Sequence, residues 1–282
     1  MPAIIDSVGQ WEGIRQTWDA AGETIALVPT MGALHAGHKA LVRVAEQEAD
    51  RVVVSIFVNP LQFGQGEDFD TYPRTLEADE AYLADTTVDV IFAPGVAEVY
   101  PEGLDASPRM HAGPVGDVLE GQSRPGHFDG VLTVVHRLCE LVRPSVAVFG
   151  EKDAQQLFLV RQMVREEKLP VRIVEVATVR DDDGLALSSR NAHLSPVDRE
   201  RAKLIPLAWE AAQNSGNLTD ALVAVREVLS RDSAVSIDYV SSVDPDTFMP
   251  VNGGSVSRGR IVLAVEIGQT RLIDNRLLEF GQ

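Results

Sequence analysis

The feature that most constrains the fold is an alternation of apolar runs and helical periodicity between residues 24 and 179. Apolar residues recur at helical spacing within 131–142 and 157–164, each between two strand-like runs. Three of the five runs are nearly continuous in apolar residues, as expected of strands buried on both faces of a parallel sheet. Strands that alternate with helices predict a doubly wound α/β domain with helices on both faces. The five runs are TIALVPT (24–30), RVVVSIFV (51–58), VDVIFAP (88–94), SVAVFG (145–150) and VRIVEVATV (171–179).

The pattern changes after about residue 180, where DDDG (181–184) indicates a turn. Helices that are followed by strands, without alternation, predict a smaller α+β domain. We therefore expect two domains, residues 1–179 and residues 180–282. The second domain contains helical runs at about 196–214 and 217–232 and strand-like runs at 236–243 and 260–268.

Charge and cysteine content exclude several classes of function. The formal net charge is -17, from 25 Lys and Arg against 42 Asp and Glu. Such a surface repels nucleic-acid backbones and anionic lipid, so neither is an expected partner. The single cysteine, Cys139, excludes an internal disulfide and is expected to be a packed core thiol. Neither a signal-like start nor a membrane-length apolar run is present, so a cytoplasmic location is expected.

The segment PTMGALHAGH, from Pro29 to His38, follows the first predicted strand and precedes a predicted helix. A strand, a glycine-containing turn and a helix N-terminus form an anion site, because backbone N–H groups and the helix dipole point at the ligand. Two imidazoles add donors for the charge that develops on a phosphate. The segment predicts an ATP site that activates a carboxylate by adenylyl transfer. In the alternatives, one histidine caps the helix while the other packs, or His35 and His38 bind zinc.

Polar clusters follow other predicted strands. Asn59 and Gln62 offer amides for an uncharged part of a substrate, or they cap the loop backbone. In FGEKDAQQ (149–156), Lys152 can neutralise phosphate as a point charge. LSSRN (187–191) offers hydroxyls and a guanidinium for a terminal phosphate, or forms a simple turn at the surface. Because the carboxyl ends of parallel strands meet at one edge of a sheet, we expect these clusters to share one site.

These segments, in this order, resemble the pantothenate synthetase (pantoate–β-alanine ligase) family over nearly the whole chain. The resemblance implies a Rossmann-like first domain, a smaller second domain and a homodimer. It also implies a two-step reaction, in which (R)-pantoate is adenylated by ATP with Mg²⁺ and β-alanine then displaces AMP. The segments are PTMGALHAGH, VSIFVNPLQFG, EDFDTYPRT, GVLTVV, VFGEKDAQQL, LSSRN and TRLIDN.

The resemblance also implies roles for individual residues. The nucleotide-binding residues are Pro29, Met31, Gly32, Ala33, Leu34, His35, Ala36, Gly37, His38, Gly150, Glu151, Lys152, Asp153, Val179, Leu187, Ser188, Ser189 and Arg190. The catalytic residues among them are His35, His38, Lys152, Ser188, Ser189 and Arg190. The substrate-binding residues are Asn59, Gln62, Tyr72 and Gln156. His38 is expected to be the proton donor, and Asp79 is the candidate ligand of magnesium.

Three other functions share parts of this pattern. A different HxGH nucleotidylyltransferase would have the histidine loop and the sheet, but not the NPLQFG and DAQQL segments. A non-catalytic nucleotide sensor would be expected to lack the reactive side chains, all of which are present. An enzyme that charges RNA fits poorly with the acidic surface.

Overall fold

The computed structural model describes residues 1–64, 66–67, 69–105, 109–251 and 257–280. The chain forms two compact units, which are described separately. Unit 1 contains Met1–Glu151 and Gln155–Ala177, and unit 2 contains Lys152–Ala154 and Thr178–Gln282. The sequence placed residues 152–154 and 178–179 in the first domain, whereas in the structure they group with unit 2. Among the described residues, no helix has the length and apolar character needed to cross a membrane.

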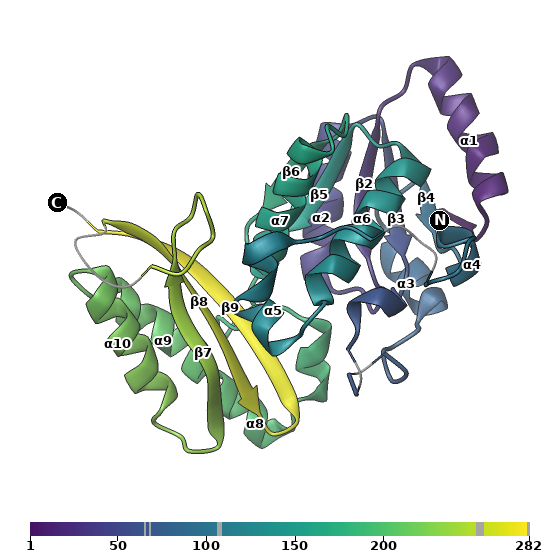
Figure 1. Cartoon of the computed structure of the whole chain (residues 1–282). Helices are drawn as coiled ribbons and strands as arrows, with labels where there is room; N and C mark the ends of the chain where they lie inside the picture. Colours follow the sequence, from purple (N-terminus) through teal and green to yellow (C-terminus); the bar gives the residue numbers. More distant parts are fainter. Residues whose placement is uncertain (65, 68, 106–108, 252–256, 281–282) are drawn as a thin grey trace. The chain divides into compact units, whose positions relative to one another are not determined.

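Unit 1 is built on a six-stranded sheet in which every pair of neighbouring strands is parallel (Figure 1). From the central strand β2 the chain runs outward through β3 to β4, then crosses back to β5 on the other side of β2. This reversal is the point at which open α/β sheets bind ligands. The predicted parallel sheet is confirmed, and the short edge strand β1 is an addition to it. In spatial order the strands are β1 (Ala3–Ile5), β4 (Val90–Phe92), β3 (Arg51–Ile56), β2 (Ile25–Thr30), β5 (Val146–Gly150) and β6 (Arg172–Val176).

Helices cover both faces of this sheet. On one face, Val42 of α2 and Leu83 of α3 join the core formed by alternate residues of the strands. On the other face, the ring of Trp11 in α1 packs against Phe92, and its Nε1–H donates to the carbonyl of Leu141 in α6. Cys139 of α6 is buried, and this burial raises its pKa to about 12, in agreement with a packed thiol. The helices are α1 (Val8–Ala21), α2 (Ala36–Glu48), α3 (Leu76–Leu83), α4 (Val96–Val99), α5 (Glu120–Ser123), α6 (His127–Val142) and α7 (Ala154–Glu166).

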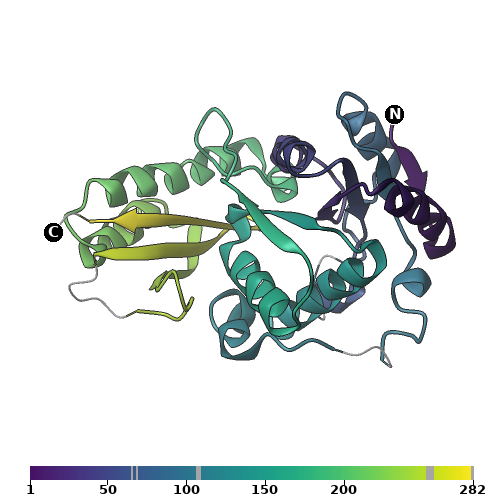
Figure 2. The same ribbon diagram turned by 90° about the horizontal axis from the view of Figure 1, so that it is seen from above.

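Unit 2 contains a three-stranded antiparallel sheet with helices packed along one side (Figure 2). Its core is formed by the inner faces of α9, α10 and the sheet, with Trp209 and Leu263 almost completely buried. The smaller α+β part that the sequence predicted is confirmed. The elements are α8 (Pro196–Ala202), α9 (Leu204–Gln213), α10 (Leu218–Leu229), β7 (Val235–Val243), β8 (Arg258–Ile267) and β9 (Thr270–Glu279).

Two elements of unit 2 differ from the prediction. The single helix expected at 196–214 is divided into α8 and α9. Pro206 explains the division, because proline has no N–H to donate to the carbonyl of Ala202 four residues earlier. Strand β9 was not predicted, because charged and amide side chains at Arg271, Asp274 and Asn275 interrupt its apolar pattern.

Candidate active site

The predicted ATP loop connects β2 to α2 in a conformation that requires glycine. Gly32 has φ +86 and Ala33 has φ +50, both in the left-handed region. A Cβ atom at position 32 would lie 3.0 Å from Oδ2 of Asp79 and 3.1 Å from Cγ2 of Ile56. The side chain of Asp79 therefore lies directly against the loop.

Asp79 holds this loop through its backbone. The carboxylate belongs to α3 and is 2% exposed. Its Oδ2 accepts the N–H of Ala33 at 3.1 Å, and its Oδ1 accepts the N–H of Leu34 at 2.7 Å. The hydroxyl of Thr75 also donates to Oδ2, at 3.1 Å. Hydrogen bonds of this kind to a carboxylate are among the stronger ones in proteins, so the loop is fixed before ligand arrives.

The sequence had placed Asp79 as a candidate magnesium ligand. In the structure its two oxygens receive three hydrogen bonds, so the geometry does not favour that role. The described part of the chain also contains no group of three or more His, Cys, Asp or Glu side chains suited to a metal ion. Asp79 and its neighbours therefore do not fit a magnesium ion held by the protein. The alternative that His35 and His38 bind zinc likewise lacks a third ligand among the described residues.

The two histidines cap helix α2 through the same ring atom. His35 is the N-cap, and its Nδ1 accepts the N–H of Gly37 at 3.1 Å. Nδ1 of His38 accepts the N–H of His35 at 3.2 Å, and the two ring centroids lie 4.1 Å apart. A neutral imidazole whose Nδ1 accepts a hydrogen bond carries its proton on Nε2. Both rings therefore cap the helix, whereas the alternative gave one of them a packing role, and this capping is compatible with phosphate binding because Nε2–H is the donor nitrogen.

Asn59 is a buried scaffold at the end of the neighbouring strand β3. It is 1% exposed and caps the short 3₁₀ helix Pro60–Gln62. Its Oδ1 accepts the hydroxyl of Tyr100 at 2.9 Å, and its Nδ2 donates to the carbonyl of Gly130 at 3.0 Å. A Cβ at Gly130 would lie 2.1 Å from the carbonyl oxygen of Leu61, so only glycine lets α6 approach this loop. These contacts favour the loop-capping interpretation of Asn59.

Gln62 links the loop after β3 to the ATP loop. Its Oε1 accepts from Nδ2 of Asn59 at 3.2 Å, and its Nε2 lies 2.9 Å from Sδ of Met31. Because Asn59 fixes the oxygen end of the amide, the amino end is the one beside the histidine segment. Two of the predicted clusters are thus brought together, with an amide donor beside the nucleotide loop.

His127, which the sequence analysis did not single out, contacts the backbone of Gln62. Nδ1–H of His127 donates to the carbonyl of Gln62 at 2.8 Å, and Arg124 donates to its Nε2 at 3.1 Å. Burial, with the Arg124 charge adding to it, lowers the pKa of His127 to about 4, so the ring is neutral near pH 7. Arg124 in turn bonds Glu67. His127 is 65 residues from Gln62 along the chain, so no local pattern could have revealed the contact.

Two other predicted substrate residues have different surroundings. The ring of Tyr72 is buried and packs edge-on against Phe63, with centroids 5.9 Å apart. Gln156 is half-buried in the first turn of α7. Its neighbour Gln155 is buried, and its Nε2 donates to the carbonyls of Val115, in the 3₁₀ helix Gly113–Asp117, and of Val118, at the end of that helix. The two glutamines therefore divide their roles, and only Gln156 is available as a substrate contact.

The predicted cluster after β5 straddles the division of the chain. Gly150 ends β5 in unit 1, and Glu151–Asp153 forms a single 3₁₀ turn. Lys152 groups with unit 2, and its Nζ lies 3.8 Å from Oδ1 of Asp153. Its side chain is 20% exposed, and the carboxylate of Asp153 is the ionic partner of its ammonium.

Unit 2 holds the last predicted cluster on a small hairpin. The N–H of Leu187 donates to the carbonyl of Val179 at 2.9 Å, which brings two predicted nucleotide contacts side by side. The DDDG turn is formed, with Gly184 at φ +83. After the hairpin, Oγ of Ser188 accepts the N–H of Arg190 at 3.3 Å. This is the simple turn geometry that the sequence left open, and it presents Ser188–Arg190 at the start of a 3₁₀ helix.

The chain thus carries an HxGH loop on the central strand of a doubly wound parallel sheet, which is the arrangement of α/β enzymes that transfer adenylyl groups. Residues 3–277 match the family described as pantoate-beta-alanine ligase. A pantothenate synthetase of Acidothermus cellulolyticus is 49% identical, with 97% of this chain and 91% of that protein covered. One from Nocardia farcinica is 47% identical, with 99% and 85% covered. The chain belongs to the pantoate–β-alanine ligase family.

Solved structures agree with this assignment. The crystal structure of pantothenate synthetase from Thermus thermophilus superposes with a TM-score of 0.89 at 45% identity, covering 97% of this chain and 98% of that one. A pantoate-beta-alanine ligase from Francisella tularensis, complexed with Beta-gamma ATP and β-alanine, gives a TM-score of 0.80 at 37% identity, with 98% of each chain covered. The predicted family, fold class and enzyme class, a pantoate–β-alanine ligase, are confirmed.

Proposed function

We propose that this chain joins (R)-pantoate to β-alanine through a pantoyl-adenylate intermediate, releasing AMP and pyrophosphate. One observation supports the roles that we assign to individual residues. The Asp79-held loop carries two imidazoles whose Nδ1 atoms cap the start of α2, and the amide of Gln62 lies beside Met31 of the same loop. The Francisella relative complexed with Beta-gamma ATP and β-alanine supports the same pair of ligands here.

In the first step, a carboxylate oxygen of pantoate attacks the α-phosphorus of ATP. The bond from that phosphorus to the bridging oxygen breaks, and the electron pair leaves with pyrophosphate. Negative charge grows on the α-phosphate oxygens, where the N-terminus of α2 and the Nε2–H groups of His35 and His38 stabilise it. The amino group of Gln62, with Gln156, holds pantoate. Because pantoate is bound and oriented beside ATP, the reaction no longer depends on a random encounter of the two molecules.

For the rest of the triphosphate, the proposal follows the resemblance to the family. Lys152 supplies a positive charge, and Ser188, Ser189 and Arg190 supply hydroxyl and guanidinium donors. Their support is the chemistry of the side chains and the exposure of Lys152 to solvent. The charges matter because the chain as a whole is strongly acidic, so anionic substrates need local cations.

In the second step, the amine of β-alanine attacks the acyl carbon, the bond from that carbon to the AMP oxygen breaks, and the amine loses one proton. His38 is in the wrong tautomer to receive that proton, because its Nδ1 already accepts a backbone N–H and its Nε2 carries hydrogen. We therefore assign the proton to a phosphate oxygen of the departing AMP. His38 acts as a donor in both steps.

Three further features belong to the proposal. The reacting nucleotide is MgATP, with the metal held chiefly by phosphate oxygens, as is usual for magnesium. The protein works in the cytoplasm, and it forms a homodimer, as the resemblance to the family implies. Sedimentation at working concentration tests the dimer directly.

The activity is tested with purified protein, ATP, magnesium, pantoate and β-alanine. AMP, pyrophosphate and pantothenate should form in equal amounts. With β-alanine omitted, the enzyme should still exchange labelled pyrophosphate into ATP, provided that pantoate is present. Exchange with unrelated carboxylic acids but not with pantoate would reject the substrate. Absence of AMP release with all four components present would reject the activity.

A further inference from the structure

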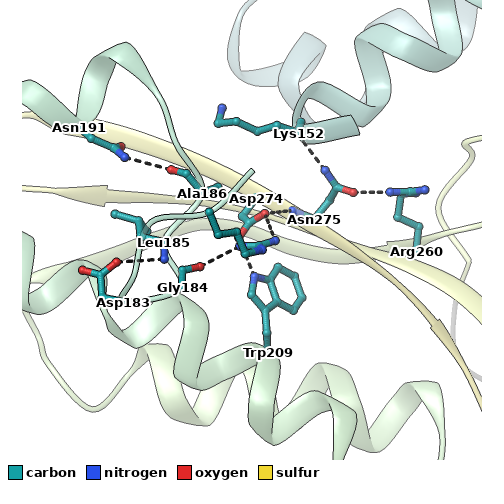
Figure 3. A network of polar contacts seen from close by, with 11 residues as sticks. Lys152, Asp183, Gly184, Leu185, Ala186, Asn191, Trp209, Arg260, Asp274 and Asn275 are labelled. Carbon is teal, nitrogen blue, oxygen red and sulfur yellow. Dashed lines mark hydrogen bonds and ion pairs between the residues drawn. The ribbon is translucent and has the colours of Figure 1, made fainter. Parts of the chain in front are cut away.

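The segment TRLIDN (270–275) has no role in the reaction described above, yet it contains two adjacent buried polar side chains. It belongs to the edge strand β9, where Asp274 is 3% exposed and Asn275 is 6% exposed. Consecutive side chains of a strand point to opposite faces of the sheet. Asp274 and Asn275 therefore make contacts on two different sides of β9 (Figure 3).

Asp274 holds the hairpin that leads to Ser188–Arg190. Its two carboxylate oxygens accept from Nη1 of Arg180 at 2.7 Å and from Nη2 at 3.0 Å, a bidentate pair. Nε1–H of Trp209 donates to the same carboxylate at 2.7 Å. Arg180 also donates to the carbonyl of Gly184, so one guanidinium fixes both sides of the hairpin turn.

Asn275 holds Lys152 through its main chain. Nδ2–H of Asn275 donates to the carbonyl of Lys152 at 2.9 Å. On the other end of the amide, Oδ1 accepts from Nη1 of Arg260, on the adjacent strand β8. Because a guanidinium can only donate, Arg260 fixes which end of the amide is oxygen and directs the amino end at Lys152 (Figure 3).

Stability alone does not account for these groups. Replacement of a buried ion pair by apolar side chains of similar size is often neutral or stabilising, so such pairs are weak evidence of a stabilising role. Lys152 has a long, flexible side chain, and its ammonium is placed only as accurately as the backbone that carries it. A hydrogen bond to its main-chain carbonyl restricts that backbone without touching the ammonium.

We propose that Asn275 is a positioning residue for ATP, because it fixes the backbone of Lys152 while its neighbour Asp274 fixes the hairpin that carries Ser188–Arg190. One dipeptide of β9 thereby sets two phosphate-binding segments relative to each other. The inference rests on the proposed function, which assigns Lys152 and Ser188–Arg190 to the phosphates of ATP.

The test compares Asn275→Asp with Lys152→Ala and with the double variant. Aspartate has nearly the shape of asparagine and keeps an oxygen for Arg260, but it sets a second oxygen against the carbonyl of Lys152. Pyrophosphate exchange with pantoate gives kcat and KM for each substrate. We expect Asn275→Asp to lower kcat/KM for ATP roughly 10-fold, the effect of about one lost hydrogen bond to a charged or fixed group. KM for pantoate should change by less than about twofold.

The double variant separates positioning from general damage. If Asn275 acts through Lys152, the added Asn275→Asp change should cost no more than about twofold in the Lys152→Ala background. Asn217→Asp is the matched control, because at this exposed N-cap of α10 it likewise replaces an amide donor, here one that donates to the carboxylate of Asp220, by an oxygen, and Asn217 lies outside the segments assigned to ATP. It adds the same charge to unit 2 and should leave all constants unchanged.

Each outcome decides the inference. Loss of ATP kcat/KM in Lys152→Ala, with Asn275→Asp unchanged, overturns the role of Asn275 and leaves the proposed function standing. If the kinetic constants of Lys152→Ala equal those of the wild-type enzyme, the proposed role of Lys152 is rejected, and the inference with it. Additive losses in the double variant, or equal losses in kcat with no change in any KM, mean that Asn275 only supports the fold. If Asn275→Asp does not fold, Arg260→Met should give the same ATP-selective loss to a smaller extent, and an unchanged KM for ATP would overturn the inference.

Discussion

At the scale of single residues, the hydrogen-bond partners decide which chemistry each ring nitrogen can perform. His35 and His38 both use Nδ1 to accept a backbone N–H, so both carry their proton on Nε2. His127 has the opposite tautomer, because its Nδ1 donates to a carbonyl and its Nε2 accepts from Arg124. Two of these three histidines thus share one tautomer and the third has the other, which their sequence positions do not reveal.

Replacement of His38 by alanine tests its assignment as a donor. His38→Ala should lower the rate of adenylate formation by roughly 10²–10³, the scale of one lost donor to a developing charge. Rapid-quench measurement of pantoyl adenylate gives this rate directly. His38→Gln, which retains a side-chain N–H, should recover part of it. A near wild-type rate in His38→Ala would contradict the role.

The lowered pKa of His127 predicts a dependence of stability on pH. An unfolded histidine gains a proton near pH 6.5, whereas burial and Arg124 delay that gain to about pH 4 in the folded chain. Between these values the unfolded state binds more protons, so stability should fall as the pH falls from about 6.5 to 4, by on the order of 3 kcal/mol. Above pH 6.5 this contribution is complete.

Urea unfolding across pH 4–7 measures this slope, with His127→Gln as the control. Carboxylates that do not act on His127 contribute equally to both proteins, whereas Glu67 and Glu120 act on its ring by charge, so their coupling to the ring is part of its effect. The difference between the two proteins therefore reports His127. Parallel curves for wild type and His127→Gln would mean that the ring is not held neutral.

At the scale of elements, α3 and the loop after β2 form a unit through Asp79. Asp79→Asn replaces one acceptor oxygen with an amino group that faces a loop N–H, and it removes the charge from both remaining bonds. We expect kcat/KM for ATP to fall about 10- to 100-fold, since bonds to charged groups contribute about 1.5–3 kcal/mol. KM for pantoate should change little. The apparent affinity for magnesium at saturating ATP should not change.

Thr75→Val is a milder version of the same change, because it removes only the hydroxyl donor to Asp79. A large shift in magnesium affinity in Asp79→Asn, with KM for ATP unaltered, would instead restore Asp79 as a metal ligand. Losses in kcat/KM for ATP in both variants, with magnesium affinity unchanged, would thus indicate that Asp79 supports the loop and does not bind the metal.

The elements also show what sequence patterns can predict. The buried strands β2, β3 and β5 were predicted because parallel strands require local apolar runs, and their polar ends then indicated the site. Strand β9 was missed because its polar residues have partners in distant segments, such as Lys152, 123 positions away. Asp79 supports the ATP loop across 45 residues of sequence. This contact depends on how α3 packs beside the loop, which the periodicity of apolar residues does not predict.

At the scale of the whole molecule, the two units have separate cores. One core contains residues of unit 1, among them Leu83, and the other contains residues of unit 2, among them Leu263. Both leucines are 0% exposed. Proteins open in cooperative parts that often coincide with such units, and each part has its own free energy of opening.

This arrangement predicts that damage to one core stays within its unit. Leu263→Ala should cost about 2–5 kcal/mol, the usual range for a buried leucine, and it should weaken amide protection in β7–β9. Protection in β2 and β3 should change little, and Leu83→Ala should give the reverse pattern. Hydrogen exchange followed by mass spectrometry measures both sets of strands in one experiment. If either variant lowered protection equally in both sheets, the units would unfold as a single cooperative structure, and positioning by β9 would then be inseparable from global stability.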